Sequence, residues 1–126
     1  MPSLNFKRQF ADAVQSGQKR QTIRARRKRE WKVGDTLYLF TDMRIGTCKR
    51  IGQATLKSVQ KIAVIAQKRE VHLEKAMASG GSYLARLSDE EALDLALADG
   101  FATLDDFFAF FAQIHGRSFG GHLLRW

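Results

Sequence analysis

The sequence predicts an α+β domain in which a small twisted sheet or barrel packs against helices. Of its 126 residues, 44% are hydrophobic, short runs rich in β-branched and aromatic residues fill its middle, and helix-capping residues open two later segments. No apolar run approaches the roughly 18 residues that a membrane span needs. The first residues, MPSLNFKRQF, lack the apolar core of a secretory signal. We therefore expect one domain over residues 1–126, in the cytoplasm.

The elements of the first two thirds of the chain follow from its hydrophobic spacing. Phe6, Phe10 and Val14 recur at helical spacing, so residues 5–16 are expected to form a helix that ends at Gly17. Alternating and β-branched residues then predict strands. The expected strands are residues 21–25, 36–40, 47–51 and 54–66 (as one strand or as two joined by a bulge), with 69–75 continuing the sheet and 76–83 as a loose connection.

Helix signals dominate the last third of the chain. Ser88 and Glu91 form a capping box, which predicts a helix through about Ala98. A second helix is expected to begin after Thr103, and its four phenylalanines cannot all face one way, so it should be embedded against the sheet. Residues 119–126 are expected to form a last strand within the same sheet.

Positive charge is concentrated in the first part of the chain. Residues 1–69 hold 17 Lys and Arg against 4 Asp and Glu, whereas residues 70–126 hold 4 against 9. Cations bind phosphate and an indole can stack on a base, so single-stranded RNA or a modified nucleoside is the expected partner. The predicted binding residues are Arg20, Arg24, Arg26, Arg27, Lys28, Trp31, Arg44 and Lys49. Two alternatives stay open: the basic run is only a solvated loop, and Trp31 caps the end of the barrel.

The order of several motifs resembles the activating signal cointegrator homology (ASCH) domain. These motifs are GQKRQTIR, KVGDTLYLF, DMRIGTCKR, ADGF followed by a helix, and a terminal HLLRW. That family is similar in fold to the pseudouridine synthase–archaeosine transglycosylase (PUA) RNA-binding barrels, and this chain is closest to its small bacterial and phage members. The resemblance covers roughly residues 6–126 and implies a PUA-like β-barrel of about five to six strands with flanking helices. It also implies a cleft that faces the first helix and the G-x-K-x-x-T-x-R turn.

The same resemblance implies three candidate catalytic residues. Some small family members are amidohydrolases that remove the acetyl group from cytidine acetylated on its exocyclic amine, and they use a Lys and a Thr of this motif with a later acidic residue. These roles fall on Lys19, Thr22 and Asp99, although those enzymes carry Glu at the acidic position. Other members have been associated with RNA binding or RNA cleavage.

The residues themselves allow more than one role for these three. Lys19, partly desolvated near other cations, should lose its proton more easily than a free lysine and could act as a base toward Thr22. The alternative is that Lys19 and Asp99 form an ion pair that only braces the cleft. We expect RNA or nucleoside binding, with a hydrolase of the same fold (acetylcytidine amidohydrolase or ribonuclease) and a protein-interaction adaptor as alternatives. No cofactor is expected, and the three His and one Cys show no metal-ligand spacing.

Overall fold

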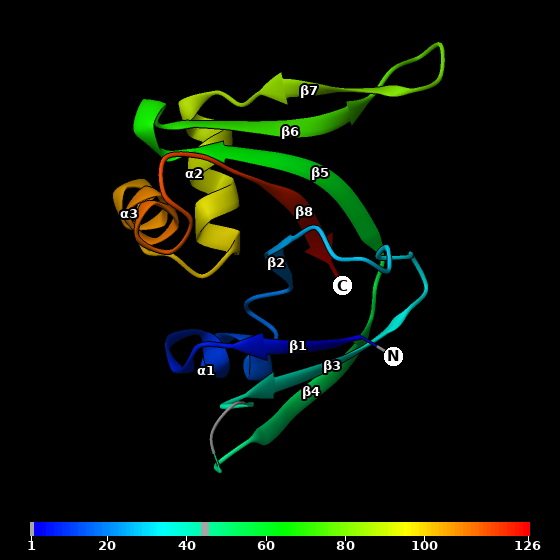
Figure 1. The fold of residues 1–126 in the computed structure, drawn as a ribbon, viewed down its shortest axis with the longest axis vertical. Helices are drawn as coiled ribbons and strands as arrows, with labels where there is room; N and C mark the ends of the chain where they lie inside the picture. The colour runs from blue at the N-terminus through cyan, green and yellow to red at the C-terminus, as the bar shows by residue number, and fades with distance from the viewer. Residues whose placement is uncertain (1, 44–45) are drawn as a thin grey trace.

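Two β-sheets and three α-helices make up the fold of the computed structural model, which describes residues 2–43 and 46–126 (Figure 1). The α+β class is therefore confirmed. The elements are β1 (Ser3–Phe6), α1 (Arg8–Ser16), β2 (Gln21–Ala25), β3 (Thr36–Thr41), β4 (Lys49–Thr55), β5 (Ser58–Ile65), the 3-10 turn η1 (Ala66–Lys68), β6 (Glu70–Ala76), β7 (Ser82–Arg86), α2 (Asp89–Ala98), α3 (Leu104–His115) and β8 (Phe119–Arg125).

The strands divide into two sheets rather than one. One sheet has the order β1-β3-β4, with β1 parallel to β3 and β4 antiparallel to it. The other has the order β2-β8-β5-β6-β7 and is antiparallel throughout. The described residues form eight strands, more than the five to six expected. Among the described residues the two sheets share no strand, so strand pairing does not close them into one barrel.

Two strands were not predicted, and both are short. β1 occupies residues 3–6. The sequence predicts no element for residues 3 and 4 and a helix from residue 5, whereas the observed helix begins only at Arg8. β7 occupies residues 82–86, immediately after a connection with two glycines of positive φ, Gly80 and Gly81. β1 is stabilised by parallel pairing with β3, which lies more than thirty residues later, and local spacing does not report such pairing.

The remaining elements match the sequence closely. β2 has the expected bounds. The predicted strand 47–51 corresponds to β4, which begins only at Lys49 and continues to Thr55. The predicted strand 54–66 is therefore divided, because the chain turns at Leu56 and Lys57 between β4 and β5. The capping box of α2 is confirmed: the Ser88 hydroxyl accepts from the Glu91 N–H at 3.1 Å, and the Glu91 carboxylate accepts from the Ser88 N–H at 3.0 Å. The last strand, β8, lies between β2 and β5.

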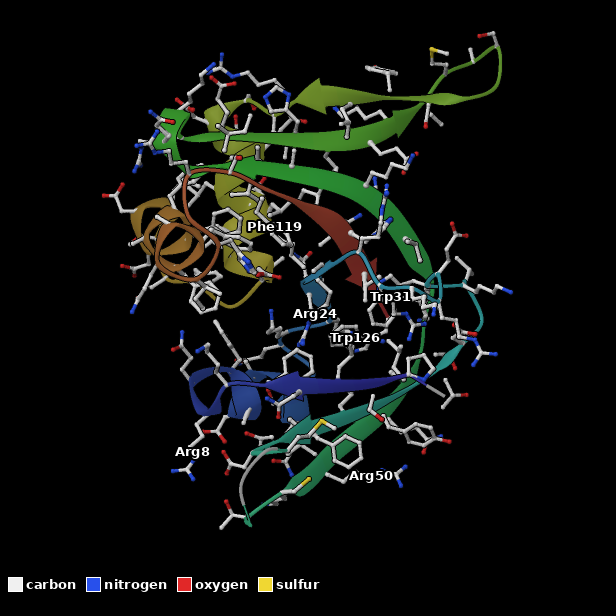
Figure 2. All side chains as sticks on the ribbon, viewed as in Figure 1. Arg8, Arg24, Trp31, Arg50, Phe119 and Trp126 are labelled. Atoms are coloured by element: carbon white, nitrogen blue, oxygen red, sulfur yellow. The ribbon has the colours of Figure 1, made fainter. Side chains whose placement is uncertain are left out.

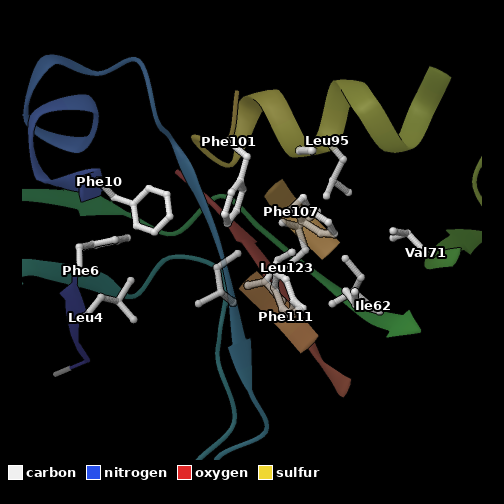
Figure 3. Close-up of a cluster of buried hydrophobic side chains, with 14 of the residues drawn as sticks. Leu4, Phe6, Phe10, Ile62, Val71, Leu95, Phe101, Phe107, Phe111 and Leu123 are labelled. Carbon is white, nitrogen blue, oxygen red and sulfur yellow. The ribbon is translucent and has the colours of Figure 1, made fainter. Parts of the chain in front are cut away.

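The core surrounds β8 on both faces. Leu123 and Leu124 are consecutive and so point to opposite faces of the strand, yet both are fully buried. The phenylalanines of α3 form part of this core: the Phe107 and Phe111 rings lie 4.8 Å apart, and Phe107 also contacts Phe101 (Figure 3). Each such buried side chain stabilises the fold by about 1.5–3 kcal/mol. The expectation that α3 is embedded against the sheet is confirmed.

Candidate functional site

A glycine turn directs Lys19 into the protein. α1 ends at Gly17, whose φ of 84° places it in the left-handed region that favours glycine, and its N–H donates to the Val14 carbonyl at 3.2 Å. The Lys19 N–H then donates to the Ala13 carbonyl at 2.9 Å. The chain thus reverses into β2 with the Lys19 side chain buried, only 3% exposed.

Lys19 pairs with Asp99, the residue that caps the C-terminus of α2. The Lys19 Nζ lies 3.1 Å from Asp99 Oδ1 and also donates to the Asp99 backbone carbonyl. Gly100 permits this approach: its φ is 98°, and a Cβ there would lie 2.9 Å from Phe10 Cδ1 and 3.3 Å from Lys19 Cδ. The motif near the start of the chain and the acid before α3 therefore meet in a buried ion pair.

Thr22 and Arg24 follow on one face of β2, as the alternation of the strand requires. The Arg24 Nε donates to Thr22 Oγ1 at 3.0 Å, and its Nη2 donates to the Asn5 carbonyl at 2.8 Å. The guanidinium also lies 4.8 Å from the centre of the Phe6 ring. Because the Thr22 oxygen accepts from Arg24, its own O–H is directed away from Arg24 and can donate to another group.

These four side chains line one cavity. Its volume is about 220 Å³, and Lys19, Thr22, Arg24 and Asp99 all contribute to its wall. Arg24 lies between the two sheets in Figure 2. Five phenylalanines form much of the remaining wall: Phe6, Phe10, Phe101, Phe110 and Phe111. The cavity therefore combines hydrogen-bonding groups with flat apolar surfaces, which suits an aromatic heterocycle.

Burial shifts the pKa values of the charged groups in this cavity. Desolvation lowers the pKa of Lys19 although Asp99 opposes it, and desolvation raises the pKa of Asp99 although Lys19 opposes it. Desolvation likewise lowers the pKa of Arg24 to about 10. The two partners of the ion pair thus exchange a proton more readily than a solvated lysine and aspartate, while Arg24 remains cationic at neutral pH.

The basic loop after β2 borders a second hollow. The Arg27 guanidinium lies 3.8 Å from the centre of the Trp31 ring, and Trp31 is half-buried against the core. Arg27, Arg29 and Lys32 line a hollow of about 490 Å³, which Glu30 and Asp35 also border. β2 ends at Ala25, which lines the first cavity, and none of the described residues that line the second hollow also lines the first. The predicted cationic cleft is therefore divided into two sites, and Trp31 already has a cation on its ring.

The other predicted binding residues that the structure describes line neither hollow. Arg20, Arg26 and Lys28 are exposed on the surface. Lys49 lies on β4, the edge of the three-stranded sheet, and Arg44 falls outside the described residues.

The sequence did not identify several residues that contribute to the site. Asn5 and Lys7 line the cavity from β1 and from the residue before α1, whereas both positions were expected in the first turn of a helix. Gln21, which contacts Asp99, carries no charge and occupies a position of the G-x-K-x-x-T-x-R motif for which the motif specifies no residue.

The described residues hold no group of three or more His, Cys, Asp or Glu side chains that could bind a metal ion. Within residues 2–43 and 46–126, no helix has the length and apolar character needed to cross a membrane. No protein family, curated protein or solved structure compared with this chain matches it.

Proposed function

We propose that this chain is a PUA-like, ASCH-type domain whose Lys19–Asp99 cavity binds one nucleoside, either free and modified or unpaired within single-stranded RNA. The observation that carries the proposal is the buried ion pair, beside Arg24, in the wall of a cavity of about 220 Å³. That volume is below the roughly 300 Å³ at which pockets for drug-sized ligands begin, which favours one ring system. We take the two sheets to be the two halves of a PUA-like barrel.

The cavity supplies the contacts that an unpaired base needs. Unstacked bases are recognised through hydrogen bonds to their polar edges and through aromatic surfaces beside their rings. Arg24 has five N–H donors, of which the described contacts use two, so it can donate to a base carbonyl. Asp99 can accept from a base N–H, and the phenylalanines can pack against the ring. The exposed cations Arg26 and Lys28, in the loop that follows, can then bind flanking phosphates.

The salt dependence of RNA binding tests the role of the loop. Each phosphate that a protein neutralises on a single strand contributes about −0.7 to the slope of log K against log salt concentration. We expect the pair of changes Arg26→Ala and Lys28→Ala to flatten this slope by roughly 1.4 units, and Lys68→Ala, on η1, to leave it unchanged. If the loop variant binds RNA at low salt as tightly as the wild-type protein, the loop takes no part in RNA binding. An affinity for RNA no higher than for polyglutamate would favour a protein-interaction adaptor instead.

A nucleoside titration tests the cavity separately. Asp99→Asn removes the negative charge and replaces one of the two acceptor oxygens by an NH₂ donor, but it keeps the shape. We therefore expect weaker binding of cytidine and its acetylated form with the same salt slope on RNA. Asp94→Asn, on the exposed side of α2, is the control. Equal nucleoside affinity of the two variants would contradict the proposed cavity.

A second candidate function is hydrolysis of acetylated cytidine, because Thr22 lines the same cavity as the ion pair. A neutral Lys19 amine accepts the Thr22 hydroxyl proton while Oγ1 bonds to the acetyl carbonyl carbon, and the carbonyl electron pair moves onto oxygen beside Arg24. As the intermediate collapses, the C–N bond breaks and the exocyclic nitrogen takes the proton from Lys19. Water then cleaves the acetyl–Thr22 ester, which yields acetate and a proton and restores the hydroxyl.

The geometry ranks this candidate below binding. Among the described contacts, Lys19 donates to Asp99 and not to Thr22, so catalysis needs Lys19 to turn toward the hydroxyl. Thr22→Val keeps the shape of the side chain and removes the nucleophile, and we expect it to abolish acetate release from acetylcytidine. Thr55→Val, at the exposed end of β4, should retain full activity. Continued turnover by Thr22→Val would reject the mechanism.

A further inference from the structure

Gln21 is a buried polar side chain beside the ion pair. It is the first residue of β2 and only 5% exposed. Its Nε2 lies 3.3 Å from Asp99 Oδ1 and 3.3 Å from the Leu95 carbonyl in α2. Both neighbours are acceptors, so the amide must present its NH₂ group to them, since the opposite orientation would bring three oxygens together. Gln21 thus joins β2 to the last turn of α2.

We infer that Gln21 is a positioning residue of the cavity, which holds Asp99 so that Oδ2 is the oxygen presented to a ligand. The inference rests on the proposed nucleoside site. Lys19 Nζ and Gln21 Nε2 both contact Oδ1, at 3.1 Å and 3.3 Å. Among the described contacts, none engages Oδ2, and Asp99 lines the cavity. The oxygen that remains to accept from a base is therefore Oδ2.

A second donor is needed because a lysine alone does not orient a carboxylate. The Lys19 ammonium also donates to the Asp99 backbone carbonyl, but it is a compact charge with three N–H donors, so it can contact either carboxylate oxygen if the carboxylate turns. The Gln21 amide is held at a second point, the Leu95 carbonyl, which also accepts the Asp99 N–H at 3.0 Å. The amide therefore fixes Oδ1 relative to the α2 backbone from which Asp99 projects.

Gln21 also suits this role because it is neutral. Arg24 already adds a cation beside the buried pair. An amide donates a hydrogen bond to Asp99 without adding a further charge. A hydrogen bond to the ionised carboxylate favours the ionised form. The Gln21 contact accordingly lowers the pKa of Asp99, in opposition to burial, which raises it.

Titration of the Asp99 carboxyl carbon by NMR tests the inference without any ligand. The signal is assigned by its loss in Asp99→Asn. We expect Gln21→Met, which keeps the length of the side chain, to raise the titration midpoint of Asp99. Gln60→Met is the control, because the half-buried Gln60 amide donates to the Glu74 carbonyl at 2.9 Å and accepts from Arg125, and neither contact involves Asp99. An unchanged midpoint in Gln21→Met would overturn the inference.

A wild-type measurement covers the case in which Gln21→Met does not fold. The side-chain amide protons of Gln21 should titrate with the same midpoint as the Asp99 carboxyl carbon, and independent midpoints would overturn the inference equally. In the ligand arm, Gln21→Met should bind nucleoside roughly 3- to 10-fold more weakly than Gln60→Met. If the Asp99 midpoint moves as expected but the wild-type protein binds no nucleoside, the link between Gln21 and Asp99 stands and the proposed function fails.

Discussion

Replacement of Gly100 by alanine tests how closely the end of α2 packs on the ion pair. Gly100 has a φ of 98°, where an L side chain is strained. Its added Cβ would lie 2.9 Å from Phe10 Cδ1, which is closer than real Cβ contacts, and 3.3 Å from Lys19 Cδ. Phe10 is buried and packs edge-on against Phe101 and Phe110, so it has little room to move.

The expected destabilisation has two parts. The left-handed backbone costs about 1–2 kcal/mol for a residue with a Cβ. Overpacking against Phe10 adds about 1–3 kcal/mol. The total of roughly 2–5 kcal/mol corresponds, for a chain of this length, to a fall in Tm of about 8–20 °C, since about 1 kcal/mol shifts Tm by about 4 °C.

Urea unfolding of Gly100→Ala and Gly17→Ala separates the two parts. Gly17 also has a positive φ, 84°, but a Cβ there would meet nothing within 4 Å. Both variants share the backbone strain and the smaller entropy of the unfolded chain, so the difference between them reports the contact with Phe10. We expect Gly100→Ala to be less stable than Gly17→Ala by about 1–3 kcal/mol. Equal free energies of unfolding would refute the packing argument.

Three further predictions concern other contacts. Lys19→Met or Asp99→Asn alone leaves a buried partner unpaired and should lower the free energy of unfolding by about 3–5 kcal/mol. Urea unfolding of the double variant should show a loss smaller than the sum of the two single losses. Additive losses would contradict a coupled pair. Ser88→Ala should destabilise the protein by about 1 kcal/mol through loss of the α2 cap, and an unchanged Tm would count against that cap. Hydrogen bonds from the Ser82 hydroxyl and a backbone N–H lower the pKa of Glu74 below its ordinary 4.5. A lowered carboxyl pKa contributes stability that is lost as the pH falls through the folded-state pKa. The protection factors of amides in the β6–β7 hairpin, which correct exchange rates for their intrinsic pH dependence, should therefore fall below about pH 4.5, and less so in Ser82→Ala.

Local signals predicted the elements whose causes are local. The capping box at Ser88 depends on four consecutive residues, and the turn at Gly17 depends on one dihedral angle, so both could be predicted from the sequence. β1 could not, because a four-residue strand acquires its stability from pairing with β3, where Ser3 lies opposite Tyr38. The division into two sheets likewise depends on which strands pair.

In the candidate site too, residues within a local motif could be predicted and residues that act through long-range contacts could not. Lys19 and Thr22 stand in a recognisable motif, and Asp99 was placed by family resemblance. Gln21 stands between Lys19 and Thr22 in the chain, but its contacts are 74 and 78 residues away, and no spacing rule links them. The basic run was expected to border the same cleft as Lys19, yet Arg27, Arg29 and Lys32 line a separate hollow.

By itself, the sequence determined the α+β class, the C-terminal end of α1, both ends of α2 and α3, and the concentration of positive charge in the first part of the chain, because composition, capping and backbone preference act between near neighbours. Only the tertiary structure decided that Lys19 is buried against Asp99 while the adjacent Arg20 remains exposed. The burial, ion pairing and pKa of a side chain depend on residues that are distant in sequence but close in space, such as Asp99 for Lys19. Residues adjacent in sequence can therefore have different environments.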